Sequence, residues 1–186
     1  GLKLGQSAPA LPAHDWEALN SNAEAISRSE VFWRRRLARF QAVAPPFQSG
    51  GITPATDSVQ CELTVPEAFS RAYPGRNGLV AGVVAWLGRT TAQQELMVPI
   101  RGLTKTPPGA RCAFSEHALL QARVDPSEPL QPLHAQVDRE IERLAEHTAW
   151  PLDLISRDPE LASRPEFQNG RWNAFEIVLE SEASAS

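Results

Sequence analysis

Apolar side chains recur at helical spacing near the start of the chain. In the segment SRSEVFWRRRLARFQ, which begins at Ser27, the positions at helical spacing are Val31, Trp33 or Arg34, Leu37, and Phe40 or Gln41. Ser27 and Glu30 stand three residues apart, which is the arrangement of a capping box at a helix N-terminus. The pattern predicts an amphipathic helix that begins at Ser27 and ends at the two prolines after Ala44.

Further helices are predicted in the middle of the chain. The run LVAGVVAWLGRTTAQQ, which begins at Leu79, is apolar on nearly all sides, so we expect a buried helix with Trp86 in the core. A short helix over residues 66–73 and a turn over residues 74–78 precede it. The longest helix is expected over residues 130–147, with an apolar stripe made by Leu133, Val137, Ile141, Leu144 and Ala145.

Four segments have strand patterns. Residues 59–65 alternate between apolar and polar side chains, whereas residues 95–101 form a short continuous apolar run, typical of a strand that is covered on both faces. Residues 117–124 and the segment from Phe175 to Glu180 are the other two. Helices and strands alternate along the chain, which predicts an α/β fold.

The chain of 186 residues fits one modest domain. Residues 1–26 include Pro9 and Pro12 among small residues and are read as a leader or linker. Residues 27–180 hold all the predicted elements, and residues 181–186 form a Ser/Ala tail that we expect to be disordered. Most of the 16 prolines fall between the predicted elements, so the connections should be stiff.

Charge and hydropathy exclude several classes of function. The net charge is −4 and the basic residues are scattered apart from one cluster, so nucleic acid is not expected as a partner. No apolar run reaches the length of a membrane span, and the first residues have no signal-peptide core. We therefore expect a cytoplasmic protein that does not bind membranes.

The sequence offers no cofactor or metal site. Cys61 and Cys112 lie far apart, without a CxxC motif or a nearby histidine pair, so buried thiols are expected. No serine lies in a GxSxG motif, and no glycine-rich loop ends in Gly-Lys-Ser or Gly-Lys-Thr. His134 and Asp138 are four residues apart on the predicted long helix, which indicates a surface contact rather than a catalytic pair.

Three stretches in this order resemble the C-terminal lobe of condensation domains of non-ribosomal peptide synthetases. EVFWRRRLA, from Glu30, is similar to the Tyr-Trp-containing helix that opens that lobe. GVVAWLGRTTAQQELMVPI, from Gly82, is similar to the family's "aalLaRlTGqddvvvGvPv". LLQARVD, from Leu119, and the later Trp150-Pro151-Leu152 resemble "lpLRvD" and "HqdyPfelL". The resemblance implies an α/β, single-lobe sandwich of the chloramphenicol acetyltransferase-like fold, with a mixed β-sheet packed by helices.

The family's catalytic signature, HHxxxDG, is absent from the sequence. The four histidines are isolated and none precedes an Asp-Gly pair: His14, His117, His134 and His147. That signature belongs to the N-terminal lobe of the family, so the chain resembles a truncated domain. We expect no catalytic residues, no cofactor and no enzymatic activity of the chain alone.

What the resemblance implies instead is a structural or docking platform for an adjacent adenylation or carrier domain in peptide natural-product biosynthesis. The expected interface residues are Trp33, Arg34, Arg35, Arg36, Arg39 and Trp150. The arginines are either the solvated face of a helix or a docking face for an acidic carrier protein, and the two tryptophans are either core residues or interface anchors.

Two alternatives remain open from the sequence. The chain could supply half of an active amide-forming site whose HHxxxDG lies on another segment or chain, or it could be an unrelated α/β interaction module. An apolar face left without its lobe would favour a covalently attached neighbour or a homo-oligomer.

Overall fold

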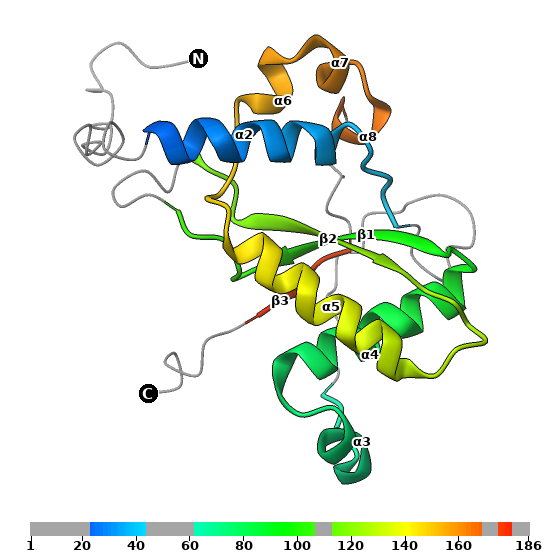
Figure 1. Cartoon of the computed structure of the whole chain (residues 1–186). Helices are drawn as coiled ribbons and strands as arrows, with labels where there is room; N and C mark the ends of the chain where they lie inside the picture. Colours follow the sequence, from blue (N-terminus) through cyan, green and yellow to red (C-terminus); the bar gives the residue numbers. More distant parts are fainter. Residues whose placement is uncertain (1–22, 44–61, 107–112, 169–174, 180–186) are drawn as a thin grey trace, which may run out of the picture.

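The computed structural model describes residues 23–43, 62–106, 113–168 and 175–179 (Figure 1). The predicted leader, apart from residues 23–26, and the predicted tail lie outside these ranges, as do Cys61 and Cys112. The described elements in chain order are α2 (Ala23–Leu37), α3 (Glu67–Ala72), α4 (Gly75–Thr91), β1 (Glu95–Arg101), β2 (His117–Arg123), α5 (Leu130–Ala145), α6 (Leu154–Arg157), α7 (Pro159–Ala162), α8 (Pro165–Gln168) and β3 (Ile177–Val178).

The three strands form one mixed sheet in the order β2-β1-β3, which confirms the predicted α/β class. β1 and β2 are antiparallel and place Val98 opposite Leu120, whereas β1 and β3 are parallel and place Ile100 opposite Ile177. Residues 96–100 are all buried, because helices cover both sides of β1. β1 has the predicted bounds and β2 is one residue shorter than predicted.

Helices lie on both sides of the sheet. In Figure 1, α4 and α5 lie below it, and α2 lies above it with α6, α7 and α8. Gly88 allows α4 to approach the end of β2 closely, since a Cβ there would lie 2.7 Å from the Val124 side chain. The core between these layers contains Trp33, Leu37, Leu87, Val98, Leu120, Val137, Leu144 and Trp150.

The helix α2 begins at Ala23, so the capping box predicted at Ser27 is wrong. Ala23, Glu24 and Ala25 favour helix and extend it by one turn beyond the serine. Inside the helix, Ser29 is buried and its hydroxyl oxygen accepts a hydrogen bond from the Thr148 amide at 3.1 Å. The serine side chains therefore do not mark the start of the helix.

The prediction of a strand over residues 59–65 is wrong for its described part. Residues 62–65 have no regular structure, and the Leu63 side chain is 81% exposed. No described strand lies beside them to pair with their backbone, so alternation alone does not create a strand here. Val59 and Cys61 lie outside the described residues.

The predicted turn over residues 74–78 is also wrong, because α4 begins at Gly75, directly after Pro74. Pro74 is the residue directly before the helix, with the extended backbone (φ −69°, ψ 150°) that proline readily adopts. Trp86 was expected in the core, but it is 47% exposed. Val80, Val84 and Leu87 take the side of α4 that is buried, which leaves Trp86 on the opposite side.

The short helix predicted over residues 66–73 is confirmed by α3, and the long helix by α5. Four residues of the predicted stripe on α5 are buried, whereas Ala145 is exposed in its last turn. The closing strand is confirmed in part as the two-residue β3. No helix among the described residues is long and apolar enough to cross a lipid bilayer.

Candidate functional site

The two tryptophans predicted as interface or core residues lie in the core of the chain. Trp33 is fully buried on α2, and its indole Nε1 donates to the Thr148 carbonyl at 2.7 Å. Trp150 is 1% exposed, and its Nε1 donates to the His117 carbonyl at 3.0 Å. Both polar edges are thus satisfied inside the chain, so these rings are not available as surface anchors.

Arg36 is also buried, with 5% of its surface exposed. Its guanidinium lies 2.5 Å from the Glu140 carboxylate of α5 and donates to the Leu119 carbonyl of β2. Burial lowers the pKa of Arg36 below its ordinary value, and the hydrogen bond and charge of Glu140 oppose that effect. Arg36 therefore joins α2 to the sheet and α5.

Arg34 points toward the short helices and is bound to Asp158. The Asp158 side chain accepts hydrogen bonds from the Glu160 and Leu161 amides and so caps α7. Burial alone would raise the pKa of Asp158, but hydrogen bonds from the Leu161 amide, the Arg34 side chain and the Glu160 amide outweigh it and lower this pKa below its ordinary value. Sequence analysis missed this partner, which lies 124 residues away from Arg34.

Two other arginines of the predicted site, Arg35 and Arg39, line a groove between α2 and α5. Arg35 and Arg39 are exposed, and no ion pair is found for either within the described ranges. The hollow has a volume of about 400 Å³. We call it the arginine groove and define it by Arg28, Phe32, Arg35, Arg36, Arg39 and Arg143.

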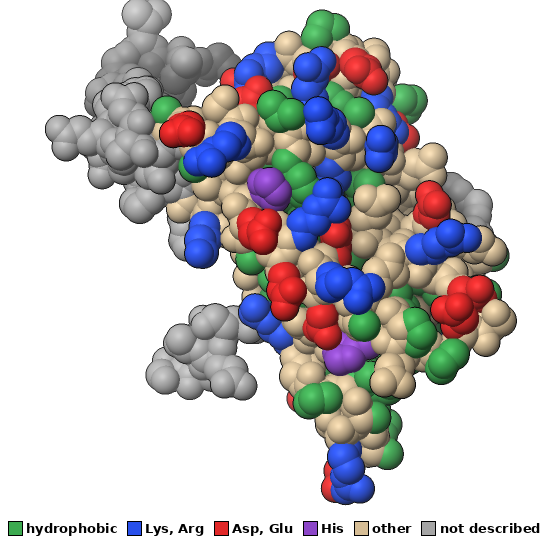
Figure 2. All heavy atoms as spheres, in the orientation of Figure 1, with side chains coloured by type: hydrophobic (Ala, Val, Ile, Leu, Met, Phe, Trp, Pro, Cys, Tyr) green, Lys and Arg blue, Asp and Glu red, His purple; other side chains and the backbone are tan. Residues whose placement is uncertain are grey.

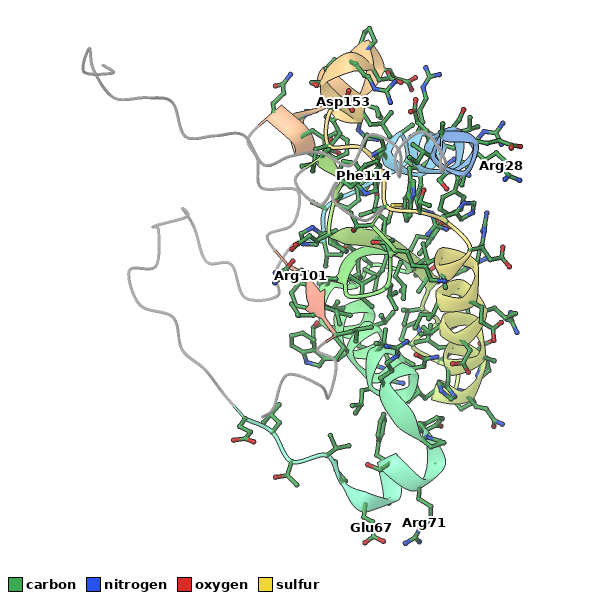
Figure 3. The ribbon with its side chains drawn as sticks, turned by 90° about the vertical axis from the view of Figure 1, so that its left-hand side faces the viewer. Arg28, Glu67, Arg71, Arg101, Phe114 and Asp153 are labelled. Atoms are coloured by element: carbon green, nitrogen blue, oxygen red, sulfur yellow. The ribbon has the colours of Figure 1, made fainter. Side chains whose placement is uncertain are left out.

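Figure 3 shows Arg28 on α2, on the side of the molecule along which α5 runs. Basic side chains gather over the region of α2 in Figure 2, whereas acidic and basic side chains alternate over α5.

Phe32 lies at the centre of this groove. The guanidinium carbons of Arg36 and Arg143 lie 4.7 Å and 5.3 Å from its ring centroid, and the His147 ring stacks on it at 3.7 Å. Burial lowers the pKa of His147, the positive charges of Arg143 and Arg36 lower it further, and Glu146 opposes them. The sequence did not reveal this cluster, because its members lie on α2 and at or just after the end of α5, more than 100 residues apart.

The described histidines have structural contacts. The His117 ring contacts the Glu176 carboxylate, which also binds Arg101 at 2.8 Å. His134 lies 3.6 Å from Asp138, which confirms the predicted contact on α5, and its ring meets Tyr73. His147 stacks on Phe32, and His14 lies outside the described residues.

The described part of the chain contains no group of three or more His, Cys, Asp or Glu side chains that could hold a metal ion.

Searches for similar proteins give solved structures only. No protein-family profile matches the chain, and no curated protein matches it. The starter condensation domain of rhizomide synthetase RzmA in complex with C8-CoA and Leu-SNAC is similar at 16% identity and a TM-score of 0.50, over 86% of this chain and 39% of that one. The first condensation domain of the CDA synthetase is similar at 17% identity and a TM-score of 0.47, over 77% and 37%.

The likeness covers most of this chain but less than two fifths of the matched structures. At this level of identity it concerns the fold, which is what the sequence resemblance implied. The chain therefore has the fold of part of a condensation domain of non-ribosomal peptide synthetases, the chloramphenicol acetyltransferase-like fold.

Proposed function

We propose that the chain is a non-catalytic, truncated condensation-like domain that serves as a structural or docking platform for a neighbouring adenylation or carrier domain. The observation that carries this proposal is a condensation-domain fold over 86% of the chain, in a sequence without HHxxxDG. Catalysis by histidine needs a nucleophile or an orienting group within reach. The contacts of His117, His134 and His147 hold elements together instead.

The exposed surface supports a docking role. Leu79, Val83 and Trp86 follow one another at helical spacing along α4 and are 44%, 36% and 47% exposed. An apolar stripe of this kind is typical of an interaction surface. Across the sheet, Arg35 on α2 and Arg39 just after this helix offer positive charge to an acidic partner, which speeds and orients association.

The first experiment measures both parts of the proposal on the purified chain. It is mixed with an acyl-loaded and an aminoacyl-loaded carrier protein, and amide formation is followed by mass spectrometry; we expect none. Binding of the carrier protein is measured by calorimetry, and we expect R35Q/R39Q to weaken it about tenfold. Amide formation above the protein-free control would overturn the non-catalytic assignment.

The control variant R76Q/R139Q removes the same charge from exposed positions on α4 and α5 outside the arginine groove. It should bind the carrier protein as the parent chain does. An equal loss of binding in both variants would mean that the carrier responds to net charge alone, which contradicts a docking face on α2.

A second candidate is one half of an active, amide-forming site. It is favoured by the likeness to a condensation domain in complex with C8-CoA and Leu-SNAC, of which this chain spans 39%. On this hypothesis, adding a separate lobe that carries HHxxxDG gives condensation. A folded pair that associates and makes no amide would remove this alternative.

A further inference from the structure

We propose that the arginine groove binds a phosphoryl group that carries two or more negative charges. The groove is the concave surface between α2 and α5 that is lined by five arginines around Phe32. This inference does not depend on the docking role proposed above, since it concerns a small anion and not a protein partner.

The balance of charge in the groove favours an anion. Five guanidiniums line it, and the ion pairs found there involve two carboxylates, Glu140 and Glu24. Glu140 is buried and serves Arg36 at 2.5 Å and Arg143 at 3.9 Å. Glu24 lies 3.9 Å from Arg28 with most of its side chain in solvent. The guanidiniums of Arg35 and Arg39 are thus left to solvent or to a ligand.

The arginines of the groove also repel one another, and a bound anion would remove this repulsion. Arg35 lies in the last turn of α2 and Arg39 stands two residues after its end, and both line the same groove, where their positive charges repel each other. Arg36 and Arg143 add further positive charge, since their guanidinium carbons lie 4.7 Å and 5.3 Å from the Phe32 ring centroid. A bound anion would turn this repulsion into attraction.

The shape and chemistry indicate a phosphoryl group in particular. A hollow of about 400 Å³ suits a compact ligand rather than a helix of a partner protein. Guanidinium groups present paired N–H donors that match the oxygens of phosphate, and each such charge-assisted bond is stronger than a neutral one. Arg28, Arg35, Arg39 and Arg143 keep exposed side chains that can turn toward one ligand.

His147 reports on the occupancy of the groove. Its ring stacks on Phe32 at 3.7 Å, and the positive charges of Arg143 and Arg36 contribute to the lowering of its pKa. An anion between those arginines offsets their charge, so the pKa of His147 should rise when the groove is filled. Glu146, the other charged group that acts on His147, keeps its effect in both states.

The test uses pyrophosphate as the probe, with the whole chain in a phosphate-free buffer of constant ionic strength. Calorimetry should give saturable binding that R35Q/R39Q weakens about tenfold or more, which corresponds to the loss of about one charge-assisted hydrogen bond. The matched R76Q/R139Q variant should bind as the parent chain does. By NMR, pyrophosphate should raise the pKa of His147 in the parent chain, and R35Q/R39Q should need about tenfold more pyrophosphate for the same rise.

Two results would overturn the proposal. One is pyrophosphate binding that is absent, or that both double variants lose equally. The other is a poly-glutamate peptide that binds the groove more tightly than pyrophosphate and displaces it, which would assign the arginines to an acidic protein segment. If pyrophosphate binds and the carrier protein does not, the docking role fails and this proposal stands. The two failures can therefore be distinguished.

Discussion

The helix α4 ends at Ala92, whose φ of 56° lies in the left-handed region. It is the one non-glycine residue with positive φ among the described residues. For an L-amino acid with a Cβ, this conformation costs about 1–2 kcal/mol, which is why glycine usually occupies such a helix end. The chain therefore carries local strain between α4 and β1.

Replacing Ala92 with glycine should stabilise the protein. We expect Ala92→Gly to raise the free energy of unfolding by about 0.5–1 kcal/mol, because the strain is removed while the unfolded chain gains some freedom. Urea denaturation measures the change. Ala85→Gly, the same substitution inside α4, should instead lower the stability by about 1 kcal/mol, and a loss in both variants would contradict the strain.

The Asp158 carboxylate should make the free energy of unfolding depend on pH. Its pKa is lowered in the folded chain, so its contribution is present above the unfolded pKa of about 3.9 and is lost as the pH falls through the folded value. We expect the parent chain to be more stable than Asp158→Asn at pH 6 and the two to converge at low pH. Thermal denaturation from pH 6 to pH 2.5 measures this, and a constant difference would contradict the role of the charge.

At the scale of elements, the free edge of β2 is protected by side chains. Alternate backbone groups of this strand, which point away from β1, bind side chains from three other segments. The hydrogen bonds run from Trp150 Nε1 to His117 O, from Arg36 to Leu119 O, from Gln121 N to Glu140 and from Arg123 N to Gln136. Because an open strand edge invites pairing with another chain, this arrangement disfavours aggregation through β2.

Among the side chains that bind this edge, Glu140 on α5 should contribute most to the free energy of unfolding. Glu140→Ala would leave the Arg36 guanidinium buried without its carboxylate and the Gln121 amide without its acceptor. We expect a loss of about 3–5 kcal/mol in the free energy of unfolding, measured with urea. Glu142→Ala, at an exposed position of the same helix, should change stability by less than about 0.5 kcal/mol. Equal effects would contradict the proposed role of the pair.

At the scale of the whole molecule, Trp33 connects the first described helix to the chain beyond α5. Its ring is fully buried and its Nε1 binds the Thr148 carbonyl, 115 residues away. Ser29 on the same helix binds the Thr148 amide. These contacts hold α2 in the layer opposite α4 and α5.

We therefore expect the stability of the chain to depend on Trp33 far more than on Trp86. Trp33→Ala should cost about 3–5 kcal/mol, whereas Trp86→Ala should cost about 1 kcal/mol or less, since 47% of its surface is exposed. Urea denaturation followed by circular dichroism tests this. Should Trp33→Ala not fold, Trp33→Phe keeps a smaller aromatic ring and loses the indole N–H with its hydrogen bond, and it should still cost about 1 kcal/mol or more. Equal costs at both tryptophans would be contrary to this arrangement.

Local patterns in the sequence were sufficient for elements with a clear period or composition. β1, β2 and α5 lie close to their predicted bounds, because a short apolar run and an amphipathic stripe each indicate one structure. The order of these elements also implied the fold that the solved structures share. The alternation at residues 62–65 failed because a strand needs a neighbouring strand, which the local pattern does not reveal.

The sequence by itself determined the class of the fold, the main helices and strands, and the absence of HHxxxDG. Only the tertiary structure decided which predicted interface residues are on the surface: Trp33, Trp150 and Arg36 are buried, whereas Arg35 and Arg39 are exposed. The reason is physical. Burial of a tryptophan or an arginine depends on partners far away in the chain, here Thr148, His117 and Glu140, and local periodicity carries no information about them.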